Sequence, residues 1–146
     1  MNSKNKAILK KIVYTESQLT AAILTLHEAV FEKDVTQYVK DSTIKRFEYT
    51  YELAWKVIKH VLAFRGVYIN TPKELFSSAF LEGWIMSPDH WEDMIEDRNA
   101  ASHTYKSRSA EEIYHRIVKD YYYDFRVLQV NIGKVIGDEL QSSGTI

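Results

Sequence analysis

The sequence predicts an all-α fold, an up-and-down bundle of three long and two short helices. Long stretches repeat apolar residues at the 3.6-residue period of an α-helix, and no strand-like alternation competes with them. Only two prolines and five glycines interrupt the chain. The connections between the periodic segments are short, which favours antiparallel neighbours in a bundle.

The composition is that of one folded domain. A chain of 146 residues with 45% hydrophobic residues buries a core without metals or disulfides. The absence of cysteine excludes disulfide scaffolds and thiolate chemistry and fits a cytoplasmic location. We see no signal peptide and no apolar run of about 18 residues, so no membrane association is expected. The net charge of −1 argues against a protein that holds nucleic acid by bulk phosphate attraction.

Two long helices are expected first, over residues 4–32 and 42–65. Each carries one apolar stripe, and Gly66 is a plausible C-cap for the second helix. The stripes are formed by Ile8, Ile12, Leu19, Ile23, Leu26 and Val30, and by Ile44, Phe47, Tyr51, Trp55, Ile58 and Leu62. The connection between the two helices is expected at 33–41.

Two short helices follow. Thr71-Pro72-Lys73-Glu74 is a capping box with proline at the first helical position, and Gly83 closes that helix. Ser87-Pro88 starts the next helix, whose apolar side is Trp91, Met94 and Ile95.

A second capping box, Ser109-Ala110-Glu111-Glu112, opens the final long helix, which we expect to run to about Leu140. Its stripe is Ile113, Ile117, Tyr121, Phe125 and Leu128. Residues 1–140 are therefore predicted to form a single domain, with 141–146 as a loose tail. The run Tyr121–Tyr123 is interpreted as packing rather than as a platform for base stacking.

Charge changes sign abruptly at Arg98. Residues 89–97 hold five acidic side chains and no Lys or Arg, whereas residues 98–119 hold five basic and two acidic ones. Arg98 offers five N–H donors suited to a phosphate, and His103 transfers protons near neutral pH. On a straight helix these two residues lie about 140° apart, so they converge only if the helix ends near His103.

Structural explanations compete with a site there. Arg98 can pair with Asp97 or Glu96 while His103 caps a helix, and Glu52 with Lys56 has the spacing of an ordinary surface pair. The remaining histidines show no convincing spacing for metal ligands, so we predict no metal site.

Two segments together resemble a known family. Arg46-Phe47-Glu48-Tyr49-Thr50-Tyr51-Glu52-Leu53-Ala54-Trp55-Lys56, followed by Arg98-Asn99-x-x-Ser102-His103-Thr104-Tyr105, is similar to the nucleotidyltransferase substrate-binding protein family. That family belongs to the HEPN superfamily, whose helical domains are encoded beside minimal nucleotidyltransferases.

The resemblance implies a homodimeric toxin of a type VII-like toxin–antitoxin pair, acting as a metal-independent endoribonuclease without a cofactor. Arg98 and His103 would then be catalytic, with Asn99 as a positioning member of the catalytic set, and the motifs of two subunits would face one cleft. Tyr105 corresponds to the tyrosine that the partner nucleotidyltransferase, the antitoxin, modifies with AMP. RNA would be the substrate.

Two alternatives stay open at this point. In the first alternative, the protein is a non-catalytic subunit that presents a substrate to a minimal nucleotidyltransferase, as the family name implies. In the second, it is an inert helical dimer in which the Arg-x4-His spacing is structural.

Overall fold

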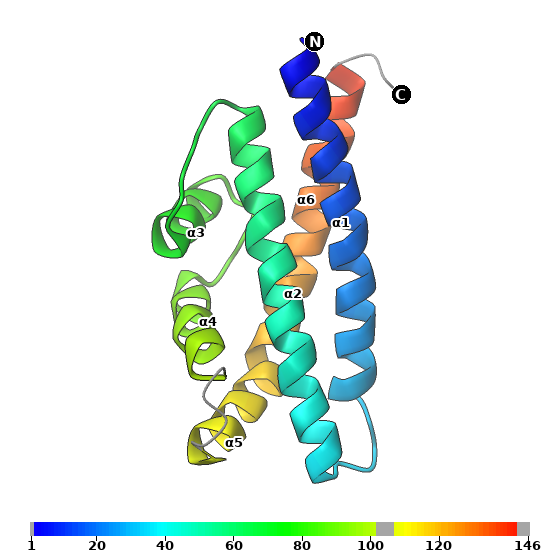
Figure 1. The fold of residues 1–146 in the computed structure, drawn as a ribbon, viewed down its shortest axis with the longest axis vertical. Coiled ribbons are helices and arrows are strands. Elements are labelled where there is room, and N and C mark those ends of the chain that lie inside the picture. Colours follow the sequence, from blue (N-terminus) through cyan, green and yellow to red (C-terminus); the bar gives the residue numbers. More distant parts are fainter. Residues whose placement is uncertain (1, 102–106, 143–146) are drawn as a thin grey trace.

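The computed structural model describes residues 2–101 and 107–142, and for residues 107–109 it describes the backbone alone. The two long helices α1 (Ser3–Val30) and α2 (Gln37–Phe64) are followed by the short helices α3 (Pro72–Leu81) and α4 (Pro88–Ala101). The last helical stretch is continuous and consists of α5 (Ser107–Arg116), a π-helical segment η1 (Ile117–Tyr121) and α6 (Tyr122–Ser142). The predicted architecture of three long and two short helices is confirmed (Figure 1).

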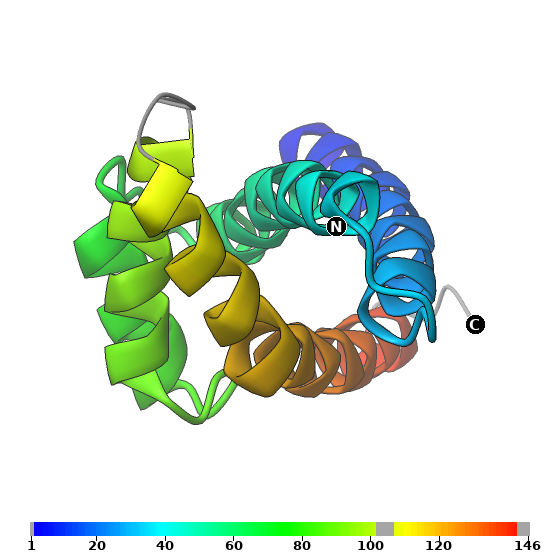
Figure 2. The same ribbon diagram turned by 90° about the horizontal axis from the view of Figure 1, so that it is seen from below.

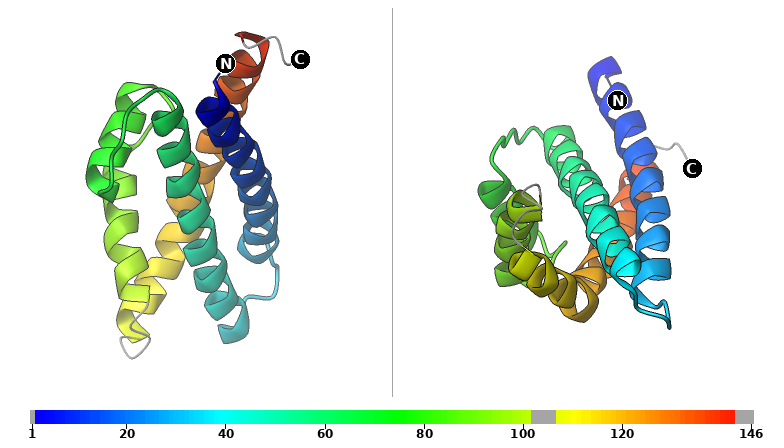
Figure 3. Two further views of the ribbon diagram at one scale, coloured as in Figure 1. Left: turned by 45° about the horizontal axis from the view of Figure 1, so that its top comes forward. Right: turned by 60° about the horizontal axis from the view of Figure 1, so that its bottom comes forward.

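Helix α2 lies at the centre of the arrangement, between α1 on one side and the α3–α4 pair on the other (Figures 1 and 3). Figure 2 shows α1, α2 and α6 as three neighbouring columns, with α3 and α4 beside them. The start of α1 and the end of α6 lie at the same end of the bundle. Within the described residues, no helix combines the length and apolar character needed to cross a membrane.

Several predicted helix ends need correction. Helix α2 begins at Gln37 rather than at residue 42, because the Thr36 side chain accepts a hydrogen bond from the backbone N–H of Val39 and caps the helix. Thr71 is at the N-cap position of α3, but its side chain makes no capping hydrogen bond, so the predicted capping box is wrong there. The last helical stretch begins at Ser107, two residues before the predicted Ser109.

The glycine that ends α2 was predicted correctly. Gly66 has a φ of 83°, in the left-handed region that favours glycine. The backbone N–H of Val67 donates to the carbonyl of Leu62, and that of Gly66 to the carbonyl of Ala63. This Schellman pattern satisfies carbonyls that the helix end would leave unpaired.

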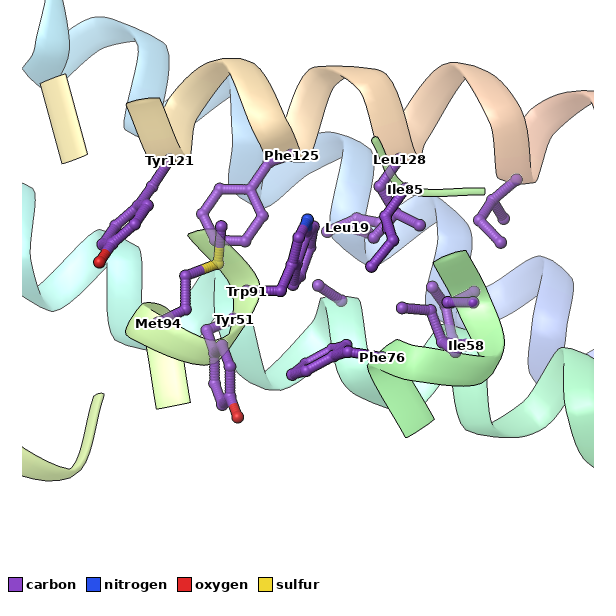
Figure 4. Packing of buried hydrophobic residues seen from close by; sticks show 14 of the residues in the cluster. Leu19, Tyr51, Ile58, Phe76, Ile85, Trp91, Met94, Tyr121, Phe125 and Leu128 are labelled. Atoms are coloured by element: carbon purple, nitrogen blue, oxygen red, sulfur yellow. The ribbon is translucent and has the colours of Figure 1, made fainter. Parts of the chain in front are cut away.

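The core is centred on Trp91 of α4, which is fully buried (Figure 4). Its ring centroid lies 4.9 Å from that of Phe76 on α3 and 5.6 Å, edge-on, from that of Phe125 on α6. Such tilted and edge-on pairs add about 0.5–1.5 kcal/mol each to the free energy gained from burial. Phe47 of α2 stacks on Tyr121 at 5.4 Å and extends the aromatic core toward η1.

The π-helical segment follows from the spacing of the last apolar stripe. Ile113, Ile117, Tyr121 and Phe125 are all buried although each is four residues after the previous one. In a regular α-helix four residues turn by about 400°, so a strict spacing of four drifts away from the core by about 40° each time. The wider turn of η1 compensates for this drift.

A buried carboxylate lies where α6 begins. Asp124 is 9% exposed and receives a hydrogen bond of 2.8 Å from Nδ1 of His90 on α4. Burial raises the pKa of Asp124 to about 6, while the interaction with His90 lowers it and the neighbouring charge of Asp120 raises it. The folded protein therefore binds a proton at Asp124 more tightly than the unfolded chain does.

We predict that Asp124→Asn weakens the pH dependence of stability. Because the pKa of Asp124 is higher in the folded protein than in the unfolded chain, its protonation stabilises the fold. This stabilisation is complete below the pKa of the unfolded chain, near 4, and is lost as the pH rises through about 6. The parent should therefore lose on the order of 1–3 kcal/mol of unfolding free energy between pH 4 and pH 7 relative to the variant. Urea unfolding across this range tests it, with the exposed Asp138→Asn as the control. Parallel curves for parent and Asp124→Asn would contradict the prediction.

Candidate functional site

Two adjacent residues near the end of α4 point in different directions. Trp91, Met94, Asp97 and Ala101 are the buried positions of this helix, so Asp97 occupies a place in the apolar stripe. Arg98 is one residue further, about 100° around the helix. Asp97 consequently faces the junction of α5 and η1, whereas Arg98 faces α2.

Arg98 is held by Glu52 from the middle of α2. Its Nε and Nη2 atoms lie 3.1 and 3.0 Å from the same carboxylate oxygen, Oε1 of Glu52. The other oxygen, Oε2, accepts a hydrogen bond of 3.1 Å from the indole N–H of Trp55. The side chains of Arg98 and Glu52 are 32% and 35% exposed. The result is an oriented guanidinium that solvent still reaches.

A buried tyrosine lies beside this ion pair. Burial and, to a smaller extent, the negative charge of Glu52 raise the pKa of Tyr51 to about 12 against the opposing effect of Arg98. Tyr51 is therefore a neutral phenol at physiological pH. It belongs to the aromatic core, where its ring packs 6.0 Å from that of Phe76.

Asp97 is the anchor of the α4 end. Nε and Nη2 of Arg116 donate to its two carboxylate oxygens at 2.6 and 2.7 Å, and the hydroxyl of Tyr121 donates to Oδ2. Hydrogen bonding to Asp97 raises the pKa of Arg116, and burial together with Asp97 raises that of Tyr121. Both donors thus remain protonated under physiological conditions, and the cluster joins α4 to the end of α5 and to η1.

Arg116 and Tyr121 reach one carboxylate because the segment between them is π-helical. They are five residues apart, which on a regular α-helix places them about 140° apart. The i→i+5 hydrogen bonding of η1 widens the turn and brings both side chains to the same side.

Residues 15–134 of the sequence match the family described as nucleotidyltransferase substrate binding protein like. The match extends over most of the chain and includes Glu52, Arg98 and the segment between them. The chain belongs to this family. The resemblance inferred from the two motifs is therefore confirmed. No curated protein matches the sequence.

Solved structures support the same fold. A Thermus thermophilus protein is 28% identical, with a TM-score of 0.71 over 78% of this chain and 98% of the other. A tri-AMPylated Shewanella oneidensis HEPN toxin, solved with MNT antitoxin, is 18% identical, with a TM-score of 0.69 over 92% of this chain and 99% of the toxin. A Haemophilus influenzae protein, described as showing the fold of a substrate binding domain of a nucleotidyltransferase, is 23% identical, with a TM-score of 0.61 over 86% and 97%.

The structure shows some of the predicted site residues of this family member. Arg98 is partly exposed, and Asn99 is exposed at the next position of α4. His103 and Tyr105 lie outside the described residues. The proposed pairing of Arg98 with Asp97 is wrong, because Asp97 binds Arg116 and Tyr121 instead.

Two further interpretations have an outcome. The predicted surface pair of Glu52 with Lys56 is wrong, since the Glu52 carboxylate instead accepts hydrogen bonds from Arg98 and Trp55. Packing of the tyrosine run is confirmed for Tyr121 and Tyr122, which are buried, while Tyr123 is half exposed.

Sequence reasoning missed the anchor and the partner of Arg98. The anchor had a local signal, because Asp97 follows Met94 by three residues and precedes Ala101 by four, which makes it an acid within an apolar stripe. No local sequence signal identified Glu52 as the partner of Arg98. Glu52 lies 46 residues before Arg98, and the contact arises only from the packing of α4 against α2.

We predict that Asp97→Ala destabilises the protein by about 2–4 kcal/mol. The change removes an acceptor of two charge-assisted hydrogen bonds and leaves the buried Tyr121 hydroxyl without its partner. Urea unfolding followed by circular dichroism measures the loss. The exposed neighbour Glu96→Ala is the matched control and should shift stability by less than about 0.5 kcal/mol. Equal effects of the two changes would show that the cluster does not stabilise the fold.

Proposed function

We propose that this protein is the toxin of a type VII-like toxin–antitoxin pair, a metal-independent endoribonuclease of the cytoplasm that uses Arg98 and His103. The observation that carries the proposal is the guanidinium of Arg98, which is oriented by Glu52 and yet a third exposed. Glu52 fixes the orientation of the guanidinium without burying it. A partly exposed, oriented arginine is suited to a phosphate that arrives from solvent.

The proposed reaction is internal transesterification of RNA. The ribose 2′-oxygen attacks the adjacent phosphorus, the bond from phosphorus to the 5′-oxygen breaks, and the products are a 2′,3′-cyclic phosphate and a 5′-hydroxyl. His103 takes the proton of the 2′-hydroxyl or gives one to the leaving oxygen. Arg98 neutralises the charge that develops on the phosphoryl oxygens. Asn99 positions the substrate in this proposal.

A homodimer is part of this proposal. Two surface grooves, of about 490 Å³ between α1 and α6 and about 270 Å³ between α1 and α2, are lined by residues other than Arg98. The Arg98 side chain itself is about a third exposed in the single subunit. A second copy facing it would supply a second Arg-x4-His motif and exclude water from the reacting phosphate.

The partner in this proposal is a minimal nucleotidyltransferase antitoxin. It transfers AMP from ATP to the hydroxyl of Tyr105, which releases pyrophosphate and leaves Tyr105 carrying a phosphodiester. The fold shared with the Shewanella oneidensis toxin supports such a pairing. The new phosphate would occupy the guanidinium that otherwise meets RNA.

One alternative function has its own support. The family description names a substrate-binding protein, which favours a non-catalytic subunit that presents a substrate to the nucleotidyltransferase. Such a subunit would bind the nucleotidyltransferase as the toxin does but would leave RNA intact.

We predict that Arg98→Ala and His103→Ala each reduce RNA cleavage by about 10²–10⁴-fold in excess EDTA, because each removes a group that acts on the reacting phosphodiester. Gel analysis of a mixed RNA substrate measures the rate, and circular dichroism checks that the fold persists. Arg126→Ala, an exposed arginine on α6, is the control and should cleave like the parent. RNA that stays intact with the parent protein would favour the substrate-binding subunit.

We predict that Tyr105→Phe retains cleavage but resists silencing by the nucleotidyltransferase, since phenylalanine lacks the oxygen that accepts AMP. The protein is incubated with the partner enzyme and ATP, and peptide mass spectrometry locates the added AMP. Tyr14 and Tyr38, which are exposed on α1 and α2, serve as internal controls. AMP on one of these, with Tyr105 unmodified, would refute the assignment.

A further inference from the structure

One half of the α1–α2 pair is rich in lysine and free of acid. Residues 2–15, which begin α1, contain four lysines and no Asp or Glu. Residues 53–73, which comprise the end of α2, the following loop and the first two residues of α3, also lack Asp and Glu. Because α1 and α2 run antiparallel, these two stretches lie side by side at one end of the bundle (Figure 1). The lysine strip defined here consists of Lys4, Lys11, Lys56 and Lys59.

Three of the four members of the lysine strip are close enough to act on one imidazole. His60, half-buried on α2, has a pKa that is lowered first by burial and then by the positive charges of Lys11, Lys59 and Lys56. One lysine of α1 and two of α2 thus act on the same imidazole. Among the described residues, no carboxylate lies within ion-pair distance of the four lysines of the strip.

Aromatic rings alternate with these lysines. Nζ of Lys59 lies 5.3 Å from the ring centroid of Trp55, and Nζ of Lys4 lies 5.4 Å from that of Tyr68, which is 63% exposed. Surfaces that bind single-stranded nucleic acid combine positive charge for the phosphates with flat rings for the bases. Surfaces that bind acidic proteins have no such need for rings.

The lysine strip is continuous with the candidate site. Trp55, which lies beneath Lys59, also donates to Glu52, and Glu52 holds Arg98. Glu52, Lys56 and Lys59 share one face of α2 because they are four and seven residues apart. Along the helix axis Lys59 is about 10 Å from Glu52, a distance that a short stretch of single-stranded RNA bridges.

The other half of α2 has a different character. Lys40 and Lys45 are paired with Glu111 and Glu48, at 2.8 and 3.6 Å. The positive charges of α2 are therefore neutralised before Glu52 and unpaired with any described carboxylate after it, so the positive surface lies on the second half of the helix.

We propose that the lysine strip binds the backbone of single-stranded RNA and leads it from the end of the bundle to Arg98. The inference rests on the proposed nuclease function and names the surface that holds its substrate. It also reconciles RNA binding with a net charge of −1, because the attraction is local to one strip rather than spread over the molecule.

The test is binding of an oligouridylate of about 12 nucleotides in which every 2′-hydroxyl is methylated. This RNA lacks the nucleophile, so binding is measured apart from cleavage. The strip variant carries Lys11→Gln, Lys56→Gln and Lys59→Gln in the full chain. The matched control carries Lys33→Gln, Lys45→Gln and Lys119→Gln, which change net charge equally at exposed positions outside the strip. Fluorescence anisotropy gives Kd over a series of salt concentrations.

We expect the strip variant to bind about 10–100-fold more weakly at low salt, and the slope of log K against log salt to fall by roughly 2, near 0.7 for each lost phosphate contact. The control should bind within about twofold of the parent. Unchanged binding by the strip variant, or equal losses in both variants, would overturn the inference. Normal RNA binding with lost capture of the nucleotidyltransferase would assign the strip to the partner instead.

Failure of the nuclease proposal would look different. If the parent leaves ordinary RNA intact while the strip variant alone loses affinity for the methylated RNA, the lysine strip is an RNA-binding surface and the catalytic assignment of Arg98 is wrong.

Discussion

The buried carboxylate of Asp97 fixes the geometry of the candidate site. An isolated carboxylate in the interior is costly, so the fold must bring donors to it, and here Arg116 and Tyr121 supply them. These bonds determine how α4 is rotated about its axis where it ends. Because Arg98 follows Asp97 directly, the same rotation turns its guanidinium toward Glu52 on α2. The core therefore orients a surface cation through the neighbouring residue.

Charge and geometry are divided between different residues. Arg98 and Glu52 together carry no net charge, so this pair does not attract an anion from a distance. The lysines of the strip on α1 and α2 create the long-range field, which salt screens over about 10 Å. In the proposed nuclease, the lysines gather RNA and the guanidinium orients one phosphate. This division explains how a chain with nearly balanced charge can handle a polyanion.

The features that the sequence predicted are those that depend on local patterns. Apolar periodicity located all five predicted helices. Gly66 marked the end of α2 because the backbone there adopts a left-handed conformation that glycine favours. The start of α2 was missed because Thr36 caps a polar first turn that carries no apolar stripe. The contact of Glu52 with Arg98 depends on how α4 packs on α2, which no local pattern encodes. Arg98 itself was predicted from its residue type and its motif.

The π-helical turn fixes the number of residues between α5 and α6. It accommodates one more residue than a regular turn, so the faces of α5 and α6 are out of phase by about 100° relative to an uninterrupted helix. Removing one residue from 117–120 would restore a regular helix with every chemical group of the anchor still present. It would also rotate Arg116 away from Asp97. Divergence within this family can therefore exchange side chains along this segment more readily than it can insert or delete a residue in it.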